Sequence, residues 1–553
     1  MTYSKKGSRE SRAAIERIYI SMRHLITRGA YKPMGLSGQA LVKSLMDLQP
    51  EIYGSMADPE RVELDGLLYV TERLPKGIEE CRIIHLVARE GLEESGHQAI
   101  VPLKRRRNCY RIDSERMYVE MTRGRSDIYD ILTHLTFLYI EAAKIMRHAL
   151  ENKKLSGDWK HIEKIVLNVD EEHEIESKRA LVYLSNILGR TVAETKDAVE
   201  KFEKSSGNNS LYHLVYWLGK VAIEESINEQ KKEIIFSAEL RNVIGHHIYA
   251  ESWANHIKLA LLKHKWEKRP LHIISANLHS FVNLIYGCGA LKDKSFNSIM
   301  ELADYTSKHP DSMKAIKSYA NKHGLFELDD SSGTNLGVQF IDLAKVDLKE
   351  LPIDLKITSE ETPILLIMDY AFGEQAYECM DELLKSYEGE NEKLGFSLNV
   401  KSVSVMGKAG ILKGKKGDIM IPTAHVFEGT GDNYPLQNEL NSQDFVDVGI
   451  PVFEGTMITV LGTSLQNKDV LHHFTESTWR SVGLEMEGAH YQKAIQSASR
   501  IRKSVSENVK TAYAYYASDN PLATGSTLSS GSLGVEGIKP TYWISIKILQ
   551  KVL

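Results

Sequence analysis

Two glutamates near the C-terminal end of the chain have a spacing suited to binding a sugar. In the segment Gly483–Tyr491 (GLEMEGAHY), Glu485 and Glu487 lie two residues apart, so in an extended stretch both carboxylates point to the same side. Gly488 and Ala489 then begin a predicted helix whose N-terminus meets no bulky side chain. A carboxylate pair at such a place can accept hydrogen bonds from the two hydroxyls of a sugar diol.

A second acidic position follows a predicted strand closer to the C-terminus. Tyr515–Leu522 reads YYASDNPL, an apolar strand that ends in Asp519. An aspartate at the carboxyl end of a buried strand can have its pKa raised by burial, and it then serves as a general acid.

Two glycine-containing segments precede these acids. In Met406–Leu412 (MGKAGIL), Gly407 and Gly410 flank Lys408, and glycines allow the backbone to approach a ligand closely. Gly417–His425 (GDIMIPTAH) is a predicted strand that ends in proline and polar groups. Each of the four segments is weak evidence by itself.

Taken together and in order, the four segments resemble the purine nucleoside phosphorylase and nucleosidase superfamily. That group has a Gly-x-x-Gly segment, a Gly-Asp-x-x-x-Pro strand, a Glu-Met-Glu-Gly-Ala motif and a Ser-Asp segment. The corresponding residues here are Gly407–Gly410, Gly417–Pro422, Glu485–Ala489 and Ser518–Asp519. The resemblance covers residues 360–553 only.

Within the superfamily, SDNPL at Ser518–Leu522 and GTMITVLGTS at Gly455–Ser464 look most like AMP nucleosidase. The resemblance implies that Glu487 holds the ribose hydroxyls and stabilises an oxocarbenium-like transition state. It implies that Asp519 donates a proton toward the purine N7. The substrate-binding residues that it implies or suggests are Met486, Glu485, Gly407, Lys408, Gly410, His425 and Ser518.

The choice between hydrolysis and phosphorolysis depends on what binds the nucleophile. The phosphorylase branch uses arginines and a serine, whereas Val405–Gly410 has no arginine and has Lys408 at the serine position. The loop Met368–Glu374 also lacks an arginine and offers Glu374, which resembles the water-activating acid of the nucleosidase branch. Hydrolysis is therefore the predicted reaction, with AMP as the predicted substrate, and phosphorolysis with inorganic phosphate is the alternative.

If the substrate is a nucleotide, Lys408, His425 and Lys413 are candidates to neutralise its 5′-phosphate. Ordinary structural roles remain open for several of the residues: Glu485 as a cap or ion-pair partner, Lys408 as an exposed loop residue, and Glu374 as a first-turn helix acid. A non-catalytic nucleotide sensor is the alternative from a different class of function.

Hydrophobic periodicity predicts an α/β C-terminal domain with a mostly buried central sheet, after a mainly helical N-terminal region. The resemblance to the nucleoside phosphorylases implies that this central sheet is mixed and flanked by helices. The predicted C-terminal strands are 364–368, 398–405, 418–421, 457–461 and 511–517, and the helices there are 374–388 and 486–503. The predicted N-terminal helices are 128–151, 179–203, 210–229 and 236–266. The predicted parts are a helical region 1–268, a small α/β element and connector 269–350, which includes the strand 271–275, and the domain 360–553. Residues 304–362 lack periodicity and are expected to be an irregular connector.

The composition favours an ordinary globular protein of two or three domains. The net charge is only −5 and the basic run Lys104–Arg107 is isolated, so we expect no nucleic-acid partner. No window reaches about 18 apolar residues, and the four cysteines are widely separated. We therefore expect a cytoplasmic protein with no membrane contact, no cofactor and no bound metal, and the superfamily implies a homo-oligomer. The helical His and Glu residues with shared-face spacing, such as His134, Glu141 and His148, are expected to be ion pairs and core groups.

Overall fold

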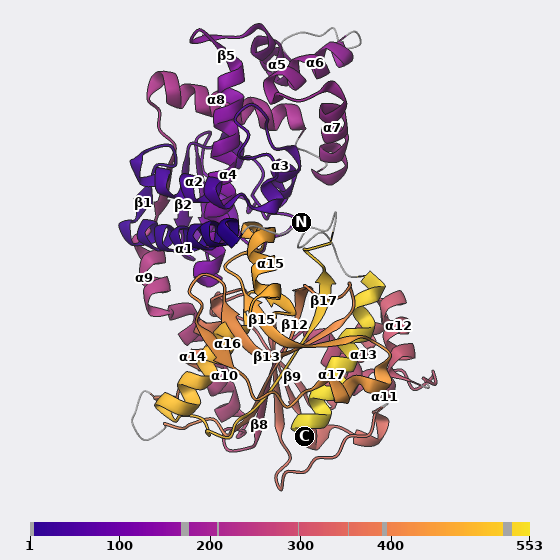
Figure 1. The fold of residues 1–553 in the computed structure, drawn as a ribbon. Coiled ribbons are helices and arrows are strands. Elements are labelled where there is room, and N and C mark those ends of the chain that lie inside the picture. The colour runs from indigo at the N-terminus through magenta and orange to yellow at the C-terminus, as the bar shows by residue number, and fades with distance from the viewer. Residues whose placement is uncertain are drawn as a thin grey trace. The chain divides into compact units, whose positions relative to one another are not determined.

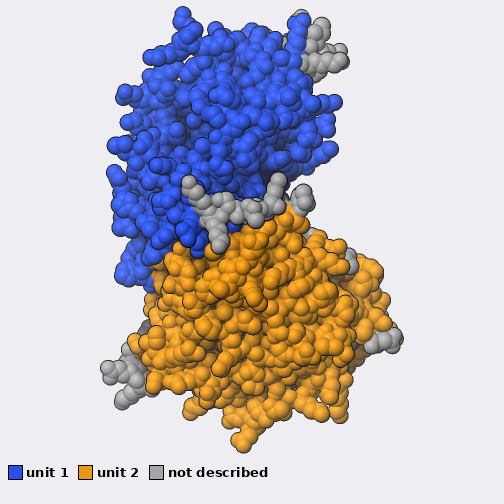
Figure 2. Space-filling model, in the orientation of Figure 1, with its two compact units in different colours: residues 1–122, 127–246, 464–470 blue, residues 123–126, 247–463, 471–553 orange. Residues whose placement is uncertain are grey.

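The computed structural model describes residues 5–167, 176–206, 210–296, 298–351, 353–389, 395–523 and 534–553. It divides into two compact units, coloured separately in Figure 2. Unit 1 consists of residues 1–122, 127–246 and 464–470. Unit 2 consists of residues 123–126, 247–463 and 471–553. The chain therefore leaves and re-enters each unit more than once.

Unit 1 contains helices and a mixed sheet. Its helices are α1 (Lys5–Arg28), α2 (Leu36–Leu48), α3 (Leu64–Thr71), α4 (Gly124–Ala149), α5 (Gly157–Leu167), α6 (Glu176–Leu188), α7 (Val192–Ser206), α8 (Leu211–Asn228) and α9 (Ala238–His246). The first residues of α4, up to residue 126, belong to unit 2. Its five-stranded sheet has the order β1 (Ala30–Tyr31), β7 (Glu233–Phe236), β2 (Ile83–Val87), β4 (Arg116–Glu120) and β3 (Cys109–Arg111). A separate hairpin joins β5 (Leu150–Glu151) and β6 (Lys154–Leu155).

Unit 1 is mainly helical, as predicted, but it also contains a sheet that was not predicted. Its strands have only two to five residues, too short to show an alternating pattern against long helical neighbours. The single helices predicted at 179–203 and 236–266 are also wrong. The first is divided into α6 and α7, and the second begins with β7 and α9 and then restarts after His247, whose φ is 53°.

Unit 2 is built around a ten-stranded mixed sheet (Figure 1). Its strands are β8 (Leu271–Ser275), β9 (Leu325–Leu328), β10 (Val338–Asp342), β11 (Ile364–Met368), β12 (Val400–Ile411), β13 (Ile419–Phe427), β14 (Asn433–Pro435), β15 (Val452–Thr459), β16 (Gly483–Glu485) and β17 (Lys510–Asp519). The path is β14-β13-β15-β16-β12-β8-β11-β10-β9, and β17 pairs with both β12 and β13. Strands β12, β17, β13, β15 and β16 are therefore hydrogen-bonded in a closed ring, as in a small barrel.

Helices cover both faces of this sheet. One apolar cluster joins the sheet to α10 (Ile248–Lys263), α14 (Gln375–Leu383) and α16 (Gly488–Gln496). A second joins the other face to α11 (Leu278–Ala290), α12 (Ile299–Lys308), α13 (Ser312–Lys322) and α17 (Ile538–Val552). Helix α15 (Lys468–Glu476) begins in unit 1 and ends in unit 2. The wholly buried strands β8 and β11 lie side by side in parallel, which explains their uninterrupted apolar sequences.

The predicted α/β class of the C-terminal part agrees with this sheet, but its boundary does not. Apart from residues 123–126, the compact unit begins at residue 247 rather than 360, because β8, β9 and β10 belong to the same sheet as the later strands. The expected connector 304–362 contains α13, β9 and β10. No helix in the described ranges is long and apolar enough to cross a membrane.

Candidate active site

The strand register of unit 2 brings the two acidic motifs to the same part of the sheet. Gly410 of β12 pairs with Leu484 of β16 on one side and with Asp519 of β17 on the other. Neighbouring strands lie about 4.8 Å apart, so the backbones of Leu484 and Asp519 are within about 10 Å of each other. Both motifs therefore flank the Gly407–Gly410 segment.

Glu485 anchors the start of helix α16. Its Oε2 accepts hydrogen bonds from the backbone N–H groups of Glu487, at 2.5 Å, and of Gly488. Its Oε1 accepts a bond from the hydroxyl of Thr459, and that hydroxyl in turn accepts the N–H of Ala489 at 3.0 Å. Three of these contacts take up backbone N–H groups of the kind that a helix N-terminus leaves open. Glu485 thus serves as a cap of helix α16, the ordinary structural role that the sequence left open for it.

Glu487 is held differently, by one bond to each of its two oxygens. Its Oε1 accepts the N–H of Gly373 at 2.9 Å, and its Oε2 accepts the N–H of Met486 at 3.2 Å. The side chain comes from the N-cap position of α16 but does not cap that helix. A carboxylate has about four acceptor positions, so each oxygen of Glu487 keeps capacity for a hydroxyl donor.

Burial makes Glu487 reluctant to ionise in the free protein. Desolvation, reinforced by the neighbouring carboxylate of Glu485, raises the pKa of Glu487 to about 8. The N–H donors of Gly373 and Met486 and the charge of Arg123 act in the opposite direction. Burial also raises the pKa of Glu485 to about 7. Perturbed carboxylates of this kind gather at functional sites, where positive charge develops or a proton is moved.

Asp519 ends strand β17 and is mostly buried. Its Oδ1 accepts a short hydrogen bond from the hydroxyl of Ser518, which also donates to the carbonyl of Ala409 at 3.0 Å. Its Oδ2 is buried and has no hydrogen-bond partner among the described residues. Burial raises the pKa of Asp519, while Ser518 and the charge of Lys408 lower it. Asp519 therefore has the environment expected of a general acid, and Ser518 orients it.

Tyr370 fills the space beside the glycine segment. A Cβ at Gly407 would lie 2.5 Å from the Tyr370 hydroxyl, so only glycine admits the ring there. That hydroxyl is buried with no hydrogen-bond partner among the described residues. Burial and the nearby carboxylate of Glu487 raise the pKa of Tyr370. Sequence reasoning missed Tyr370, although its place two residues after a buried strand was a usable signal.

Glu374 precedes helix α14 and is paired with a residue distant in sequence. Its Oε1 accepts a hydrogen bond from Nη1 of Arg125 at 2.9 Å, and its own N–H donates to the hydroxyl of Ser126 at 2.8 Å. The guanidinium carbon of Arg123 lies 4.6 Å from the centre of the Phe372 ring. Residues 123–126 are thus part of unit 2 and contact the same loop that holds Glu487.

These two arginines correct the inference that the site lacks one. That inference counted arginines only inside the motif segments, whereas Arg125 lies 249 positions from Glu374. No local sequence pattern could have revealed the contact.

The remaining candidate cations differ in their exposure to solvent. Lys408 is exposed, and its charge acts on Asp519. Lys413 is exposed as well. His425 is fully buried, its Nε2 lies 3.1 Å from the Tyr515 hydroxyl, and burial lowers its pKa to about 3. A neutral interior imidazole cannot neutralise a phosphate, so the structure corrects that role for His425.

Two further buried acids were not singled out from the sequence. Burial raises the pKa of Glu378, in the first turn of α14, and of Glu428, after β13, to about 8 each. The charge of Glu374 adds to the shift at Glu378, and that of Arg125 opposes it. The N–H of Glu428 donates to the carbonyl of Thr459 at 3.0 Å, which places its backbone at the same strand ends as Glu485.

Two further predicted positions, Met486 and Gly410, and the polar residue Asn277 have identifiable surroundings. The terminal methyl of Met486 lies 3.8 Å from where a Cβ of Gly373 would be, so Met486 packs on the β11–α14 loop. Gly410 is a buried backbone position between β16 and β17. Asn277, which follows β8, caps α11 by accepting the N–H of His279 at 2.9 Å.

Fold and site together define an α/β protein with buried carboxylates and a glycine segment at the strand ends of one unit. The chain belongs to the family of unknown function DUF6909, whose model matches residues 39–305 and 296–553. No curated protein matches the chain.

Several solved structures resemble about half of the chain. The 5′-methylthioadenosine/S-adenosyl homocysteine nucleosidase of Campylobacter jejuni is 11% identical, with a TM-score of 0.32, over 51% of this chain and 98% of that one. A futalosine hydrolase mutant of Helicobacter pylori is 10% identical, with a TM-score of 0.31 and the same coverages. A putative methylthioadenosine nucleosidase of Weissella paramesenteroides is 13% identical, with a TM-score of 0.29, over 51% and 98%. Likeness at this distance assigns no function, so the residues of the site must do so.

Proposed function

We propose that unit 2 hydrolyses the N-glycosidic bond of a purine nucleoside or nucleotide, with AMP as the best candidate, giving adenine and ribose 5-phosphate. The observation that carries the proposal is the state of Glu487. It is a buried carboxylate with a pKa of about 8, held by two N–H groups in the same part of the sheet as a second buried acid, Asp519. We infer that the two side chains face one bound nucleoside.

In the proposed step the bond between C1′ and the purine nitrogen breaks and its electron pair moves to the base. Asp519, whose pKa is raised by burial, gives its proton to N7 so that the base leaves uncharged. Positive charge develops on the ribose, and Glu487 meets it as a carboxylate while accepting the sugar hydroxyls. Glu487 must release its proton to solvent before this step, and the developing positive charge then stabilises its carboxylate.

Water completes the reaction by adding its oxygen to C1′. We assign the proton of that water to Glu374, which lies on the same loop as the Gly373 donor to Glu487. Arg125 orients the Glu374 carboxylate through the 2.9 Å bond. Lys408, exposed and close enough to Asp519 to act on its pKa, is the candidate contact for a 5′-phosphate.

Phosphorolysis is the second candidate, and Arg123 and Arg125 are the observation in its favour. Guanidinium groups bind phosphate through paired N–H donors, and here two of them reach the Phe372–Glu374 loop. In that reaction a phosphate oxygen adds to C1′ in place of water. A site that binds the nucleotide without cleaving it is the third possibility.

The experiment is incubation of the full chain with purine nucleosides and their 5′-monophosphates, with and without inorganic phosphate, followed by detection of free base. Base release without phosphate supports hydrolysis, and release only with phosphate supports phosphorolysis. Absence of release with any substrate, together with nucleotide binding, contradicts both enzymatic proposals.

Asp519→Asn tests the assignment of the acid. We expect a loss of about 10²–10⁴-fold in turnover, the usual contribution of a general acid, with nucleotide binding retained. The matched control is Asp293→Asn, because Asp293 is an exposed residue after α11, outside the candidate site. Equal turnover in Asp519→Asn and wild type would remove Asp519 from the mechanism.

A further inference from the structure

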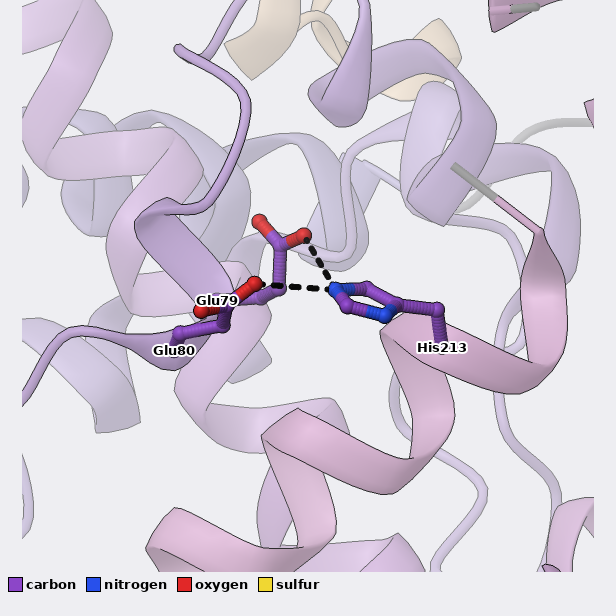
Figure 3. Close-up of side chains that lie close together, drawn as sticks. All are labelled: Glu79, Glu80 and His213. Atoms are coloured by element: carbon purple, nitrogen blue, oxygen red, sulfur yellow. Dashed lines mark hydrogen bonds and ion pairs between the residues drawn. The ribbon is translucent and has the colours of Figure 1, made fainter. Parts of the chain in front are cut away.

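A second cluster of titratable side chains lies in unit 1. Glu79 and Glu80 are the last two residues of the 3₁₀ turn η2 (Ile78–Glu80), and His213 is in the first turn of α8. Figure 3 shows both carboxylates directed at the imidazole. The Nε2 of His213 lies 3.6 Å from Oε1 of Glu79 and 3.0 Å from Oε1 of Glu80.

The outer oxygen of each carboxylate is held by another protein group. Oε2 of Glu79 accepts the N–H of Gly77 at 3.1 Å, and Oε2 of Glu80 pairs with Nη2 of Arg111 at 2.6 Å. These contacts fix the two carboxylates so that the inner oxygens face His213. Such outer partners are what orients ligand side chains in metal sites.

The inner oxygen of Glu79 is the independent observation that points to a ligand. Glu79 is only 5% exposed, and its Oε1 has no hydrogen-bond partner in the described part of the chain. A buried carboxylate oxygen without a donor is costly. A cation between the three side chains would offset that cost for Glu79 and use the free oxygen.

We propose that Glu79, Glu80 and His213 bind one divalent transition-metal cation, with Zn²⁺ or Mn²⁺ as the matching chemistry. Zinc binds carboxylate oxygen and imidazole nitrogen at about 2.0–2.2 Å, so two ligand atoms on one ion lie about 3–3.5 Å apart. The 3.0 and 3.6 Å separations are close to that range. An imidazole ligand favours this class over Mg²⁺ and Ca²⁺, which prefer oxygen ligands.

The ion would join η2 to α8. In the described residues this is the one group of three or more His, Cys, Asp or Glu side chains with ligand atoms close enough to share an ion. It was not predicted, because the two glutamates lie more than 130 positions from His213. The helical residues considered from the sequence have other partners: the ring of His134 contacts Tyr53, and Glu141 pairs with Lys144.

The test uses the full chain, freed of metal with a chelator, titrated with ZnCl₂ by calorimetry, with bound metal counted by elemental analysis. We expect about one equivalent of zinc in wild type and a loss of affinity of at least about 100-fold in His213→Ala. Arg111→Ala, which removes an outer partner, should lose about 10–100-fold. Saturating zinc should raise the melting temperature of wild type by about 5 °C.

His161→Ala is the matched control, because His161 is an exposed histidine on α5 of the same unit, and it should bind zinc as wild type does. If His213→Ala fails to fold, Glu79→Gln replaces it and should show the same loss. No zinc binding by wild type, or equal binding by wild type and the ligand variants, would overturn the proposal.

Discussion

At the scale of single residues, Glu485 and Glu487 are two positions apart and perform different tasks. Glu485 accepts two backbone N–H groups and the Thr459 hydroxyl, whereas Glu487 uses one bond per oxygen and keeps acceptor capacity. Their spacing predicted one shared face but could not show which carboxylate was already occupied. The difference becomes visible only in the fold, where the neighbouring strand places Thr459 beside Glu485.

Glu485→Ala should therefore weaken folding rather than catalysis alone. The substitution leaves the donors at the start of α16 buried without an acceptor, at about 1–3 kcal/mol for an unpaired group. We expect the free energy of unfolding in urea to fall by about 2–4 kcal/mol. Glu485→Gln keeps one acceptor oxygen and should lose less. An unchanged stability in Glu485→Ala would show that α16 is not anchored there.

Glu487 should make stability depend on pH in a definite direction. Its folded pKa of about 8 lies above the unfolded value of 4.5, so the folded state holds a proton that the unfolded state releases. The resulting stability is fully present below the unfolded pKa and is lost as pH rises to about 8. Relative to Glu487→Gln, wild type should lose about 1.4 kcal/mol per pH unit between about pH 5 and 7.5.

Urea unfolding of the two proteins across that range measures this difference directly. Comparing them cancels the contributions of other titrating groups, including His425, whose lowered pKa acts in the opposite sense at low pH. A constant difference in the free energy of unfolding from pH 5 to 7.5 would mean that the folded protein does not keep Glu487 protonated in this range.

At the scale of elements, the β11–α14 loop contacts Glu487 through Gly373 and Ser126 through Glu374. Gly373 donates its N–H to Glu487 and has a φ of 58°, a conformation that favours glycine. A Cβ there would lie 2.3 Å from the hydroxyl of Ser126. The loop must therefore have glycine at this position to place the donor.

Gly373→Ala should displace that donor and, because the N–H lowers the pKa of Glu487, raise that pKa further. For the proposed reaction we expect the acidic limb of the kcat/KM profile to move to higher pH, with a melting temperature lower than that of wild type. Gly431→Ala is the control, since Gly431 also has positive φ (71°) but open space around its Cβ position. A shift of the pH profile shared by both variants would count against a specific role for Gly373.

How far the strands could be predicted depended on their burial and on how continuous their apolar sequences are. Strands 271–275 and 364–368 are confirmed to the residue. Every position in them is buried, and each strand begins and ends where its apolar run does. Strand β12 extends to Ile411 rather than 405, since its glycines and lysine read as a turn. Strand β9 was missed because it is a short edge strand that is only partly buried, and β10, although wholly buried, was missed because Gln339 and Asp342 interrupt its apolar sequence.

At the scale of the whole molecule, each compact unit is built from stretches that are not continuous in the sequence. Residues 123–126 belong to unit 2 although they precede more than a hundred residues of unit 1, and residues 464–470 belong to unit 1. In the latter segment, Asn467 donates to the carbonyl of Leu48 at 2.9 Å. A division of the sequence at one boundary therefore removes part of each unit, which is why the linear domain prediction could not give the right sets.

A fragment of residues 247–553 should be less stable than the corresponding unit in the full chain. It lacks Arg125 and Ser126, so the carboxylate and the N–H of Glu374 both lose their partners, and it exposes Leu465 and Val470, which are buried in the full chain. We expect a lower melting temperature by circular dichroism and a tendency to aggregate.

Full-length Arg125→Ala separates the causes: it should retain the fold but lose the orientation of Glu374, lowering turnover of the proposed reaction more than nucleotide affinity. A fragment that melts with the full chain and cleaves equally well would show that residues 123–126 contribute nothing to the site, and that the arginines have no part in binding its nucleophile.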